Sequence, residues 1–281
     1  MKTGLSYNAW ISSPYFSTKH STYFSVYDKL FGKFCGEEIT FVEIGVLNGG
    51  SLFMWREFFG QKARIIGVDL NPGAKRWEAE GFEIFCGSQS DEVFWSNFVE
   101  QVGQVDIVLD DGGHTYKQQI ITVESLMPNI KNGGLLVVED THTSYQTEFG
   151  GPSKRSFIEY AKNTIDGVNY RFSAFSNNSS EKIAWGVLFY ESFVAFEIER
   201  KKCAVVSCGV VNNGENSEAE DYRYGDSPFE SLFENFKLKY VWLKRIPGLK
   251  SLVIAMIKFL KAVRVVRNIW ENKKLSKYFK Y

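Results

Sequence analysis

The sequence predicts an α/β protein built on a doubly wound, Rossmann-like sheet of mostly parallel strands. Short runs rich in Val, Ile and Leu alternate with segments of helical spacing, which is typical of strands joined by crossover helices. Two of these runs, at residues 107–109 and 135–138, stop at pairs of acids. The chain has 281 residues, of which 44% are hydrophobic, so it can bury one sizeable core.

The first helix is expected just ahead of the sheet, where the spacing of apolar residues predicts a short amphipathic segment at residues 23–31. Strands are then expected at residues 39–44, 64–68, 82–85, 106–109 and 135–138. Helices are expected between them, at residues 51–59, 74–80, 91–102 and 116–127. Parallel strands require crossovers of this kind, and these crossovers should be right-handed.

Beyond residue 150 the sequence predicts a helix with Ser153 as its N-cap, followed by an antiparallel hairpin. The apolar runs 184–190 and 193–198 are separated only by Glu191 and Ser192. That link is too short for a parallel crossover, so the hairpin should complete the sheet at one edge. Residues 212–227 are polar and acidic and predict a linker or mobile loop.

Four parts are expected along the chain: an N-terminal cap segment (1–35), the α/β core (36–200), a polar linker (201–227) and a basic helical tail (228–281). Residues 237–281 carry thirteen Lys and Arg against the single acid Glu271, a net charge of +12. Because the whole chain has a formal charge of zero, the remainder carries −12. Residues 246–270 predict an amphipathic helix with an apolar and a basic face. Its partner is left open: its own core, a second subunit of a homo-oligomer, or an anionic membrane surface met through residues 246–281.

A cytoplasmic location is expected from the four cysteines, which show no paired metal or redox spacing and are too few for a disulfide scaffold. The first eight residues lack the apolar run of a signal peptide. The longest uncharged run of the tail, residues 251–257, is far short of the roughly 20 residues that span a bilayer. A peripheral position at the inner membrane face is a further hypothesis, and no nucleic-acid partner is expected.

Acidic side chains and histidines follow two of the predicted strands at their carboxyl ends, where ligands bind in open α/β sheets. These residues are Asp110, Asp111, His114, Glu139, Asp140 and His142. The chain has only three histidines, so two of them lie at this edge. The composition indicates metal or acid–base chemistry, although a pair such as Asp110 and Asp111 taken alone also fits an ordinary strand-to-helix turn.

The first predicted strand ends in a glycine-containing turn, Gly45-Val46-Leu47-Asn48-Gly49-Gly50-Ser51. Its spacing does not match the GxGxxG fingerprint of dinucleotide-binding folds, which disfavours an NAD enzyme. Asp69, at the end of the second strand, can accept hydrogen bonds from both hydroxyls of a ribose. An adenosine-type ligand without a pyrophosphate satisfies both observations.

Six motifs in this order, across about residues 19–151, resemble one family. They are Glu43-Ile44-Gly45, Gly49-Gly50-Ser51-Leu52-Phe53-Met54-Trp55, Gly67-Val68-Asp69, Gly87-Ser88-Gln89-Ser90-Asp91, Asp110-Asp111-Gly112-Gly113-His114 and Glu139-Asp140-Thr141-His142-Thr143-Ser144-Tyr145. The chain resembles the S-adenosylmethionine-dependent, Mg²⁺-dependent sugar O-methyltransferases of macrolide biosynthesis and the related cephalosporin-hydroxylase-like proteins. Residues 36–200 would then be the methyltransferase core.

The resemblance implies a role for each matched residue. Glu43 and Gly45 would approach the methionine part of the cofactor, Asp69 its ribose, and Gln89, Ser90 and Asp91 its adenine and ribose, with Ser51 and Asp110 also at the cofactor. Asp111, Glu139 and Asp140 would bind Mg²⁺. His114 would be the general base, a role that a metal-bound water could also fill. His20, His142 and Tyr145 are candidate acceptor-binding residues.

The function predicted is transfer of a methyl group from S-adenosylmethionine to a hydroxyl, with Mg²⁺ assistance. The acceptor would be a natural-product sugar, or a sugar of a surface polysaccharide or glycolipid precursor. Two alternatives come from other classes: a non-catalytic scaffold with this fold, and a metal-dependent hydroxylase. Non-heme iron sites use two histidines and one carboxylate, whereas the ligand set implied here has only oxygen atoms, so the hydroxylase is disfavoured.

Overall fold

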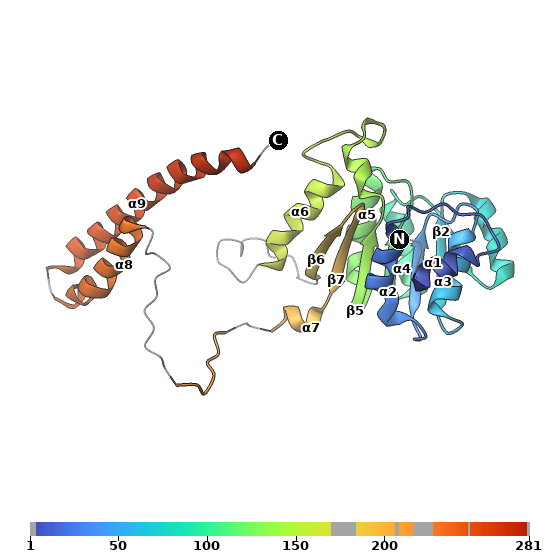
Figure 1. Ribbon diagram of the computed structural model, residues 1–281, viewed down its shortest axis with the longest axis horizontal. Coiled ribbons are helices and arrows are strands. Elements are labelled where there is room, and N and C mark those ends of the chain that lie inside the picture. The colour runs from blue at the N-terminus through green and yellow to red at the C-terminus, as the bar shows by residue number, and fades with distance from the viewer. Residues whose placement is uncertain (1–3, 170–183, 206–207, 216–226, 247, 280–281) are drawn as a thin grey trace. The chain divides into compact units, whose positions relative to one another are not determined.

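The computed structural model describes residues 4–169, 184–205, 208–215, 227–246 and 248–279. Two compact units make up the chain, Met1–Cys208 and Gly209–Tyr281. The first unit contains the β-sheet, and the second contains a pair of helices, α8 (Pro228–Tyr240) and α9 (Lys250–Leu275) (Figure 1). Most of the linker expected at 212–227 lies outside the described residues. The four-part division of the chain stays a prediction.

The first unit is built on a seven-stranded sheet, within the described residues, in the order β3-β2-β1-β4-β5-β7-β6. Its strands are β1 (Thr40–Ile44), β2 (Arg64–Asp69), β3 (Glu83–Cys86), β4 (Val105–Asp110), β5 (Ile130–Val138), β6 (Ala184–Tyr190) and β7 (Phe193–Ile198). The first five pair in parallel, while β7 runs antiparallel to β5 and to β6. The predicted doubly wound sheet and its antiparallel edge hairpin are confirmed. From β1 the chain first adds β2 and β3 on one side of the sheet, and it then adds β4 and β5 on the other side of β1. A ligand cleft is expected beside β1, where the direction of winding reverses.

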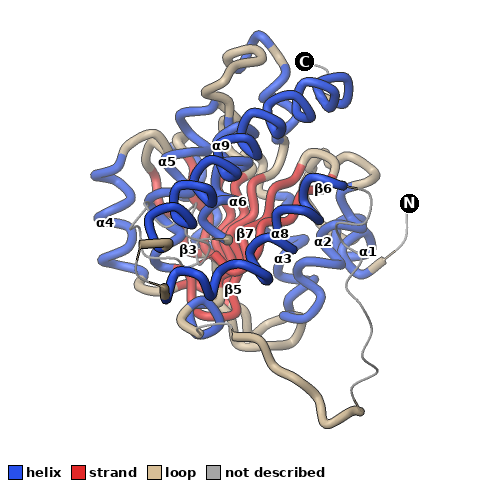
Figure 2. Tube along the Cα trace, turned by 90° about the vertical axis from the view of Figure 1, so that its left-hand side faces the viewer, coloured by secondary structure: helices blue, strands red, loops and turns tan. Residues whose placement is uncertain are grey.

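Helices cover both faces of the sheet (Figure 2). One core contains residues of α1 (Leu5–Ile11), α2 (Tyr23–Phe31), α3 (Gly50–Phe59) and the 3₁₀ helix η2 (Pro72–Glu80). The other contains residues of α4 (Glu92–Val102), α5 (Tyr116–Leu126) and α6 (Phe157–Val168). Successive residues of β4 alternate between them, since Ile107 and Leu109 lie in the first core and Val108 in the second. Burial on both faces explains why the strands appear in the sequence as continuous apolar runs.

Short helical segments complete the chain. They are η1 (Gly32–Phe34), η3 (Met127–Asn129), η4 (Thr141–Tyr145), η5 (Thr147–Phe149), α7 (Arg200–Cys203), η6 (Val241–Arg245) and η7 (Ser276–Tyr278). The helix α7 occupies the beginning of the expected linker. It is fixed there by Arg200, whose guanidinium donates to the carbonyl oxygens of Ile130 and Pro128.

Several expected boundaries are wrong. The N-cap of α6 is Ser156 rather than Ser153, because the Ser156 hydroxyl accepts from the Glu159 amide while Ser153 accepts from Arg155 in the preceding turn. Residues 74–80 lie in a 3₁₀ helix, and α1 was not predicted. The tail helix was expected at 246–270 but begins at Lys250, since Gly248 has a φ of +90°, outside the helical range.

Gly45 permits the close approach of two strand ends beneath the expected cleft. Its φ is +92°, and a Cβ built on it would lie 2.1 Å from the carbonyl oxygen of Asp111. Both the backbone conformation and the lack of space therefore require glycine at this position. The turn after β1 and the segment after β4 are held against each other at this point.

We expect Gly45→Ala to lower the free energy of unfolding by about 3–5 kcal/mol, because it combines a left-handed conformation with overpacking against backbone. Gly81→Ala is a matched control, since Gly81 has a φ of +83° but a Cβ built on it would meet no atom within 4 Å. The control should cost only about 1–2 kcal/mol. Urea denaturation of both variants checks this, and equal losses would contradict the steric argument.

Candidate functional site

A cleft with a volume of about 430 Å³ opens at the carboxyl ends of β1, β2 and β4. Four of the residues predicted to bind the cofactor line it: Gly45, Ser51, Asp69 and Gln89. Asp111 and His114, predicted for the metal and the base, line the same cleft. The other four predicted cofactor residues, Glu43, Ser90, Asp91 and Asp110, are not among its lining residues.

Asp69 holds the glycine turn in place. One of its carboxylate oxygens accepts from the backbone amides of Val46, at 2.9 Å, and Leu47, at 3.0 Å. The other oxygen accepts from the Asn71 amide at 2.8 Å. Leu47 has a φ of +47°, which is unusual for a residue with a side chain, so these bonds stabilise a strained turn at the edge of the cleft.

Glu43 lies buried beneath the same turn. Its two oxygens accept from the Ser51 hydroxyl and the Trp55 indole N–H, each at 2.8 Å. Burial raises the pKa of the Glu43 carboxyl to about 7. Glu43 therefore supports the start of α3 from below, and its predicted approach to a cofactor stays a prediction.

Gln89 connects β3 to the end of β4. Its amide N–H donates to Asp110 at 2.7 Å, and its amide oxygen accepts from the Gly113 backbone at 3.0 Å. Asp110 is buried, which raises its pKa to about 6, and its Oδ2 atom has no hydrogen-bond partner in the described part of the chain. Asp91 caps α4 by accepting from the Val93 amide at 2.9 Å. These contacts make Asp91 a helix cap and Asp110 an anchor for Gln89.

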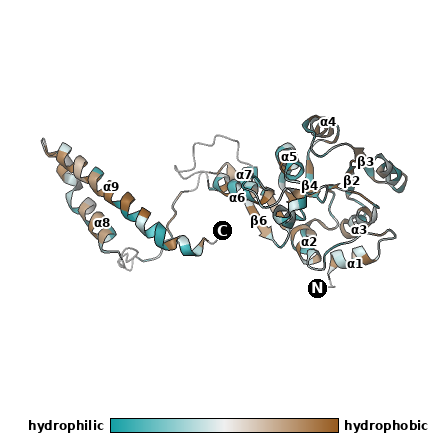
Figure 3. Ribbon diagram, turned by 90° about the horizontal axis from the view of Figure 1, so that it is seen from above, coloured by the Kyte–Doolittle hydropathy of each residue, from teal (hydrophilic) through white to brown (hydrophobic). Residues whose placement is uncertain are grey.

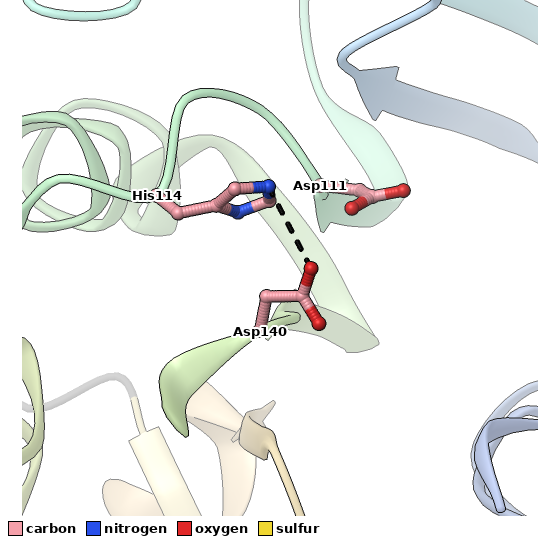
Figure 4. Close-up of side chains that lie close together, drawn as sticks. All are labelled: Asp111, His114 and Asp140. Atoms are coloured by element: carbon pink, nitrogen blue, oxygen red, sulfur yellow. Dashed lines mark ion pairs between the residues drawn. The ribbon is translucent and has the colours of Figure 1, made fainter. Parts of the chain in front are cut away.

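Asp111, His114 and Asp140 lie close together (Figure 4), and the first two line the cleft. Each offers one ligand atom, and these atoms lie within 4.8 Å of one another. His114 Nε2 is 3.6 Å from Asp140 Oδ2. Two carboxylates supply the hard oxygen donors that Mg²⁺ prefers, so the donor set fits this ion.

The backbone at this cluster is strained, and Thr143 stabilises it. His114 has a φ of +59° and Asp140 a φ of +55°, both left-handed. The Thr143 hydroxyl lies 2.8 Å from the Asp140 carbonyl oxygen and 3.1 Å from that of His114. One side chain therefore ties together the two turns that carry the cluster, in a conformation that is commonly found at functional sites.

Glu139 is held from the other side by the N-terminal segment. Lys19 Nζ lies 3.1 Å from Glu139 and also pairs with Asp111. The Tyr27 hydroxyl donates to the second Glu139 oxygen at 2.7 Å, and the Tyr23 hydroxyl donates to Asp140. All three predicted metal ligands therefore have partners here, and a direct metal contact of Glu139 stays a prediction.

The ammonium group of Lys19 is charged despite its burial. Burial by itself lowers the pKa of a lysine, but Asp111 and Glu139 raise the pKa of Lys19 well above its usual value. For Glu139, burial and the nearby Asp111 raise the pKa, and Lys19 opposes this. The lysine therefore supplies the positive charge that allows two carboxylates to lie close together.

Sequence reasoning missed Lys19, Tyr23 and Tyr27 as residues of this site. Tyr23 and Tyr27 were interpreted only as part of the apolar face of a helix. A signal was present, because a buried tyrosine hydroxyl usually needs a hydrogen-bond partner and two tyrosines four residues apart lie on one helix face. Lys19 directly precedes the predicted acceptor residue His20, and the resemblance places a Lys and a His here, but no local pattern indicated its ion pairs, since its partners are 92 and 120 residues away in the sequence.

A second cleft, of about 520 Å³, brings together all three predicted acceptor residues: His20, His142 and Tyr145. The His142 ring nitrogen Nδ1 lies 3.0 Å from the Ser192 hydroxyl in the turn between β6 and β7. Tyr23 also lines this cleft and bonds to Asp140. Asp111 and His114 line the first cleft. The acidic cluster of Asp111, His114 and Asp140 therefore contacts residues of both clefts.

We expect the stability of the Glu43→Gln variant to depend less on pH than that of the wild type. A buried acid with a raised pKa takes up a proton as the pH falls, so it destabilises the native state as pH rises from about 4.5 to about 7. Glutamine can keep both bonds, since the Ser51 hydroxyl can donate or accept.

The wild type should lose about 3 kcal/mol more than Glu43→Gln across this pH range. Urea denaturation at pH 5 and pH 7.5 measures the difference. Parallel pH dependence of the two proteins would show that Glu43 does not titrate in this range.

Removal of the Lys19 charge should destabilise the metal-free protein. Lys19→Met leaves Asp111 and Glu139 close together without a positive partner, and we expect a loss of about 3–5 kcal/mol in EDTA. Mg²⁺ should restore part of it. Lys62→Met, at an exposed position, is the control and should change stability by less than about 0.5 kcal/mol. Equal stability of the two variants in denaturation experiments would contradict this role of Lys19.

The known proteins that are similar to this chain are methyltransferases. Residues 42–141 match a family model described as a methyltransferase domain. A tetracenomycin rhamnosyl 2'-O-methyltransferase of Streptomyces olivaceus is 32% identical over 159 residues, which are 53% of this chain and 42% of that protein. Mycinamicin VI 2''-O-methyltransferase of Micromonospora griseorubida is 32% identical over 176 residues, which are 57% of this chain and 44% of the relative.

A solved structure of the MycE methyltransferase of the mycinamycin pathway, in complex with Mg, SAH and mycinamycin VI, superposes with a TM-score of 0.61 and 27% identity. The match covers 70% of this chain and 53% of MycE. The chain thus spans less than half the length of these curated relatives. Residues 42–141 thus match a methyltransferase-domain model, and over about half of its length the chain is similar to these sugar O-methyltransferases.

Proposed function

We propose that the chain transfers a methyl group from S-adenosylmethionine to a hydroxyl of a carbohydrate or glycoconjugate, with Mg²⁺ bound at the acidic cluster. The observation that carries the proposal is the placement of Asp111, His114 and Asp140 between residues of two clefts. A donor in the first cleft and an acceptor in the second would meet at these side chains. The MycE complex with Mg and SAH supports the same choice of cofactors.

The first cleft fits the donor. The glycine turn presents backbone to a ligand, and Asp69 and Gln89 lie on its lining. Asp69 would accept a hydrogen bond from one ribose hydroxyl, since a carboxylate has four lone-pair positions and three are used by backbone amides. Gln89, fixed by Asp110 and Gly113, would border the adenosine part.

His114 would act as the base. Its Nε2 atom would take the proton of the acceptor hydroxyl, and Asp140, 3.6 Å away, would stabilise the resulting imidazolium. Bound Mg²⁺ would lower the pKa of the acceptor hydroxyl. The acceptor oxygen would then form a bond to the methyl carbon as the bond from carbon to sulfur breaks, which leaves S-adenosylhomocysteine and requires no covalent enzyme intermediate.

The second cleft fits a polyhydroxylated acceptor. Its lining mixes aromatic side chains with hydrogen-bonding ones: His20, Tyr23, His142, Tyr145, Glu191 and Ser192. Aromatic rings can pack on sugar faces while imidazole, carboxylate and hydroxyl groups bind sugar hydroxyls. A sugar carried on a lipid would be a candidate acceptor if residues 246–281 contact the inner face of a membrane.

The donor set also separates this function from that of a hydroxylase. Oxygenases with non-heme iron use two histidines and one carboxylate, whereas Asp111 and Asp140, the members of the cluster proposed to hold the metal, offer only oxygen atoms. Metal analysis of the purified protein provides a direct check, because iron in place of magnesium would favour oxidation chemistry.

Calorimetric titration with S-adenosylhomocysteine, in Mg²⁺ and in EDTA, tests the proposed donor. We expect micromolar binding, with NAD as a control that does not bind. Absence of binding to S-adenosylhomocysteine would favour a scaffold protein that keeps the fold without the reaction.

The variant Asp111→Asn should abolish metal-dependent methyl transfer but keep most of the affinity for S-adenosylhomocysteine. The carboxylate is proposed to act on the metal, while Asp69 and Gln89 hold the cofactor. Asp166→Asn, an equal charge change at an exposed position of α6, should leave both properties unchanged. Loss of S-adenosylhomocysteine binding by Asp111→Asn would show that this division of the site is wrong.

A further inference from the structure

The second unit is a pair of helices with a small internal core. Phe233 of α8 and Val253 of α9 are buried. Arg264 of α9 pairs with Glu230 and Glu234 of α8, and its guanidinium lies 4.0 Å from the centre of the Phe233 ring. One face of α9 thus packs against α8 through apolar and charged contacts.

A different face of α9 is apolar and exposed. Leu252, Phe259 and Trp270 have exposed fractions of 62%, 66% and 68%. Met256, Val266 and Ile269 are also exposed. The successive spacings from Leu252 to Met256, Phe259 and Val266 are four, three and seven residues, and Ile269 and Trp270 follow Val266 by three and four, so the six form one stripe. This stripe, defined by these six residues, extends over roughly 27 Å of helix. Hydrophobic and hydrophilic residues both appear along α9 in Figure 3.

Basic residues lie beside the stripe. Lys250, Lys258 and Lys261 are exposed on the side of α9 between the stripe and the α8 contact. The single acid of residues 237–281, Glu271, is paired with Lys274. The helix α9 therefore combines a large apolar surface with a net positive charge.

This combination selects among possible partners. A second copy of α9 would bring two strongly positive surfaces together, which is unfavourable. An anionic bilayer offers an apolar interior and a negative surface at the same place. The exposed Trp270 and Tyr278 are residue types that favour the membrane–water interface. No helix among the described residues is long and apolar enough to cross a bilayer, so contact would be made along the helix side.

We propose that α9 lies in the surface of an anionic phospholipid bilayer, with the stripe among the outer acyl segments and the lysines beside the lipid phosphates. This inference does not depend on the proposed methyl transfer. It assigns the tail a lipid partner and gives the chain a peripheral position on a membrane.

Co-sedimentation of the full chain with vesicles tests the proposal. We expect binding to vesicles of phosphatidylglycerol and phosphatidylethanolamine, weaker binding in 0.5 M NaCl, and little binding to phosphatidylcholine. The double variant Phe259→Gln, Trp270→Gln keeps every charge and a good helix former at both positions, and it should lose at least about tenfold in affinity. The control Val265→Gln changes an exposed apolar residue outside the stripe, 59% exposed, and should bind as the wild type does.

Three outcomes would overturn the proposal. Equal binding to phosphatidylcholine would show that binding does not depend on lipid charge. Wild-type affinity of the double variant would show that the stripe does not contact the bilayer. A dimer in analytical ultracentrifugation that the double variant abolishes, without vesicle binding by the wild type, would assign the stripe to a second copy. Binding of S-adenosylhomocysteine is measured in parallel, so that failure here is distinguished from failure of the proposed methyl transfer.

Discussion

The ion pairs of Lys19 with Asp111 and Glu139 are the interaction on which the site depends. Parallel strands that end in acids bring several carboxylates to one edge of a sheet, where their charges repel each other. A buried carboxylate without a partner is costly, so the fold needs a positive charge and hydrogen-bond donors at this place. Lys19, Tyr23 and Tyr27 supply them from the N-terminal segment.

The N-terminal segment is consequently part of the site and not only a cover of the sheet. Lys19 lines the first cleft, and the next residue, His20, lines the second. The segment that balances the acidic charge thus also borders both proposed ligands. A change in that segment would act on the acids, the donor cleft and the acceptor cleft together.

The acids are also positioned by backbone that is not in its preferred conformation. His114 and Asp140 both have positive φ values, and Thr143 contacts the carbonyl oxygens of both. Such strain persists where surrounding contacts fix it, as Thr143 and the Tyr23 bond to Asp140 do here. The result is a cluster preorganised to hold a cation and a base close together.

The sequence by itself determined the succession of strands along the chain, the edge of the sheet that carries the acids, and the limits of the terminal hairpin strands. Periodicity and link length are local properties, and they are sufficient for such features. Only the tertiary structure decided which acid has which partner. It placed Glu43 and Asp110 beneath the cleft, made Asp91 a helix cap, and joined Lys19 to residues about a hundred positions away. Contacts between distant segments depend on how helices and strands pack, and no local pattern records that packing.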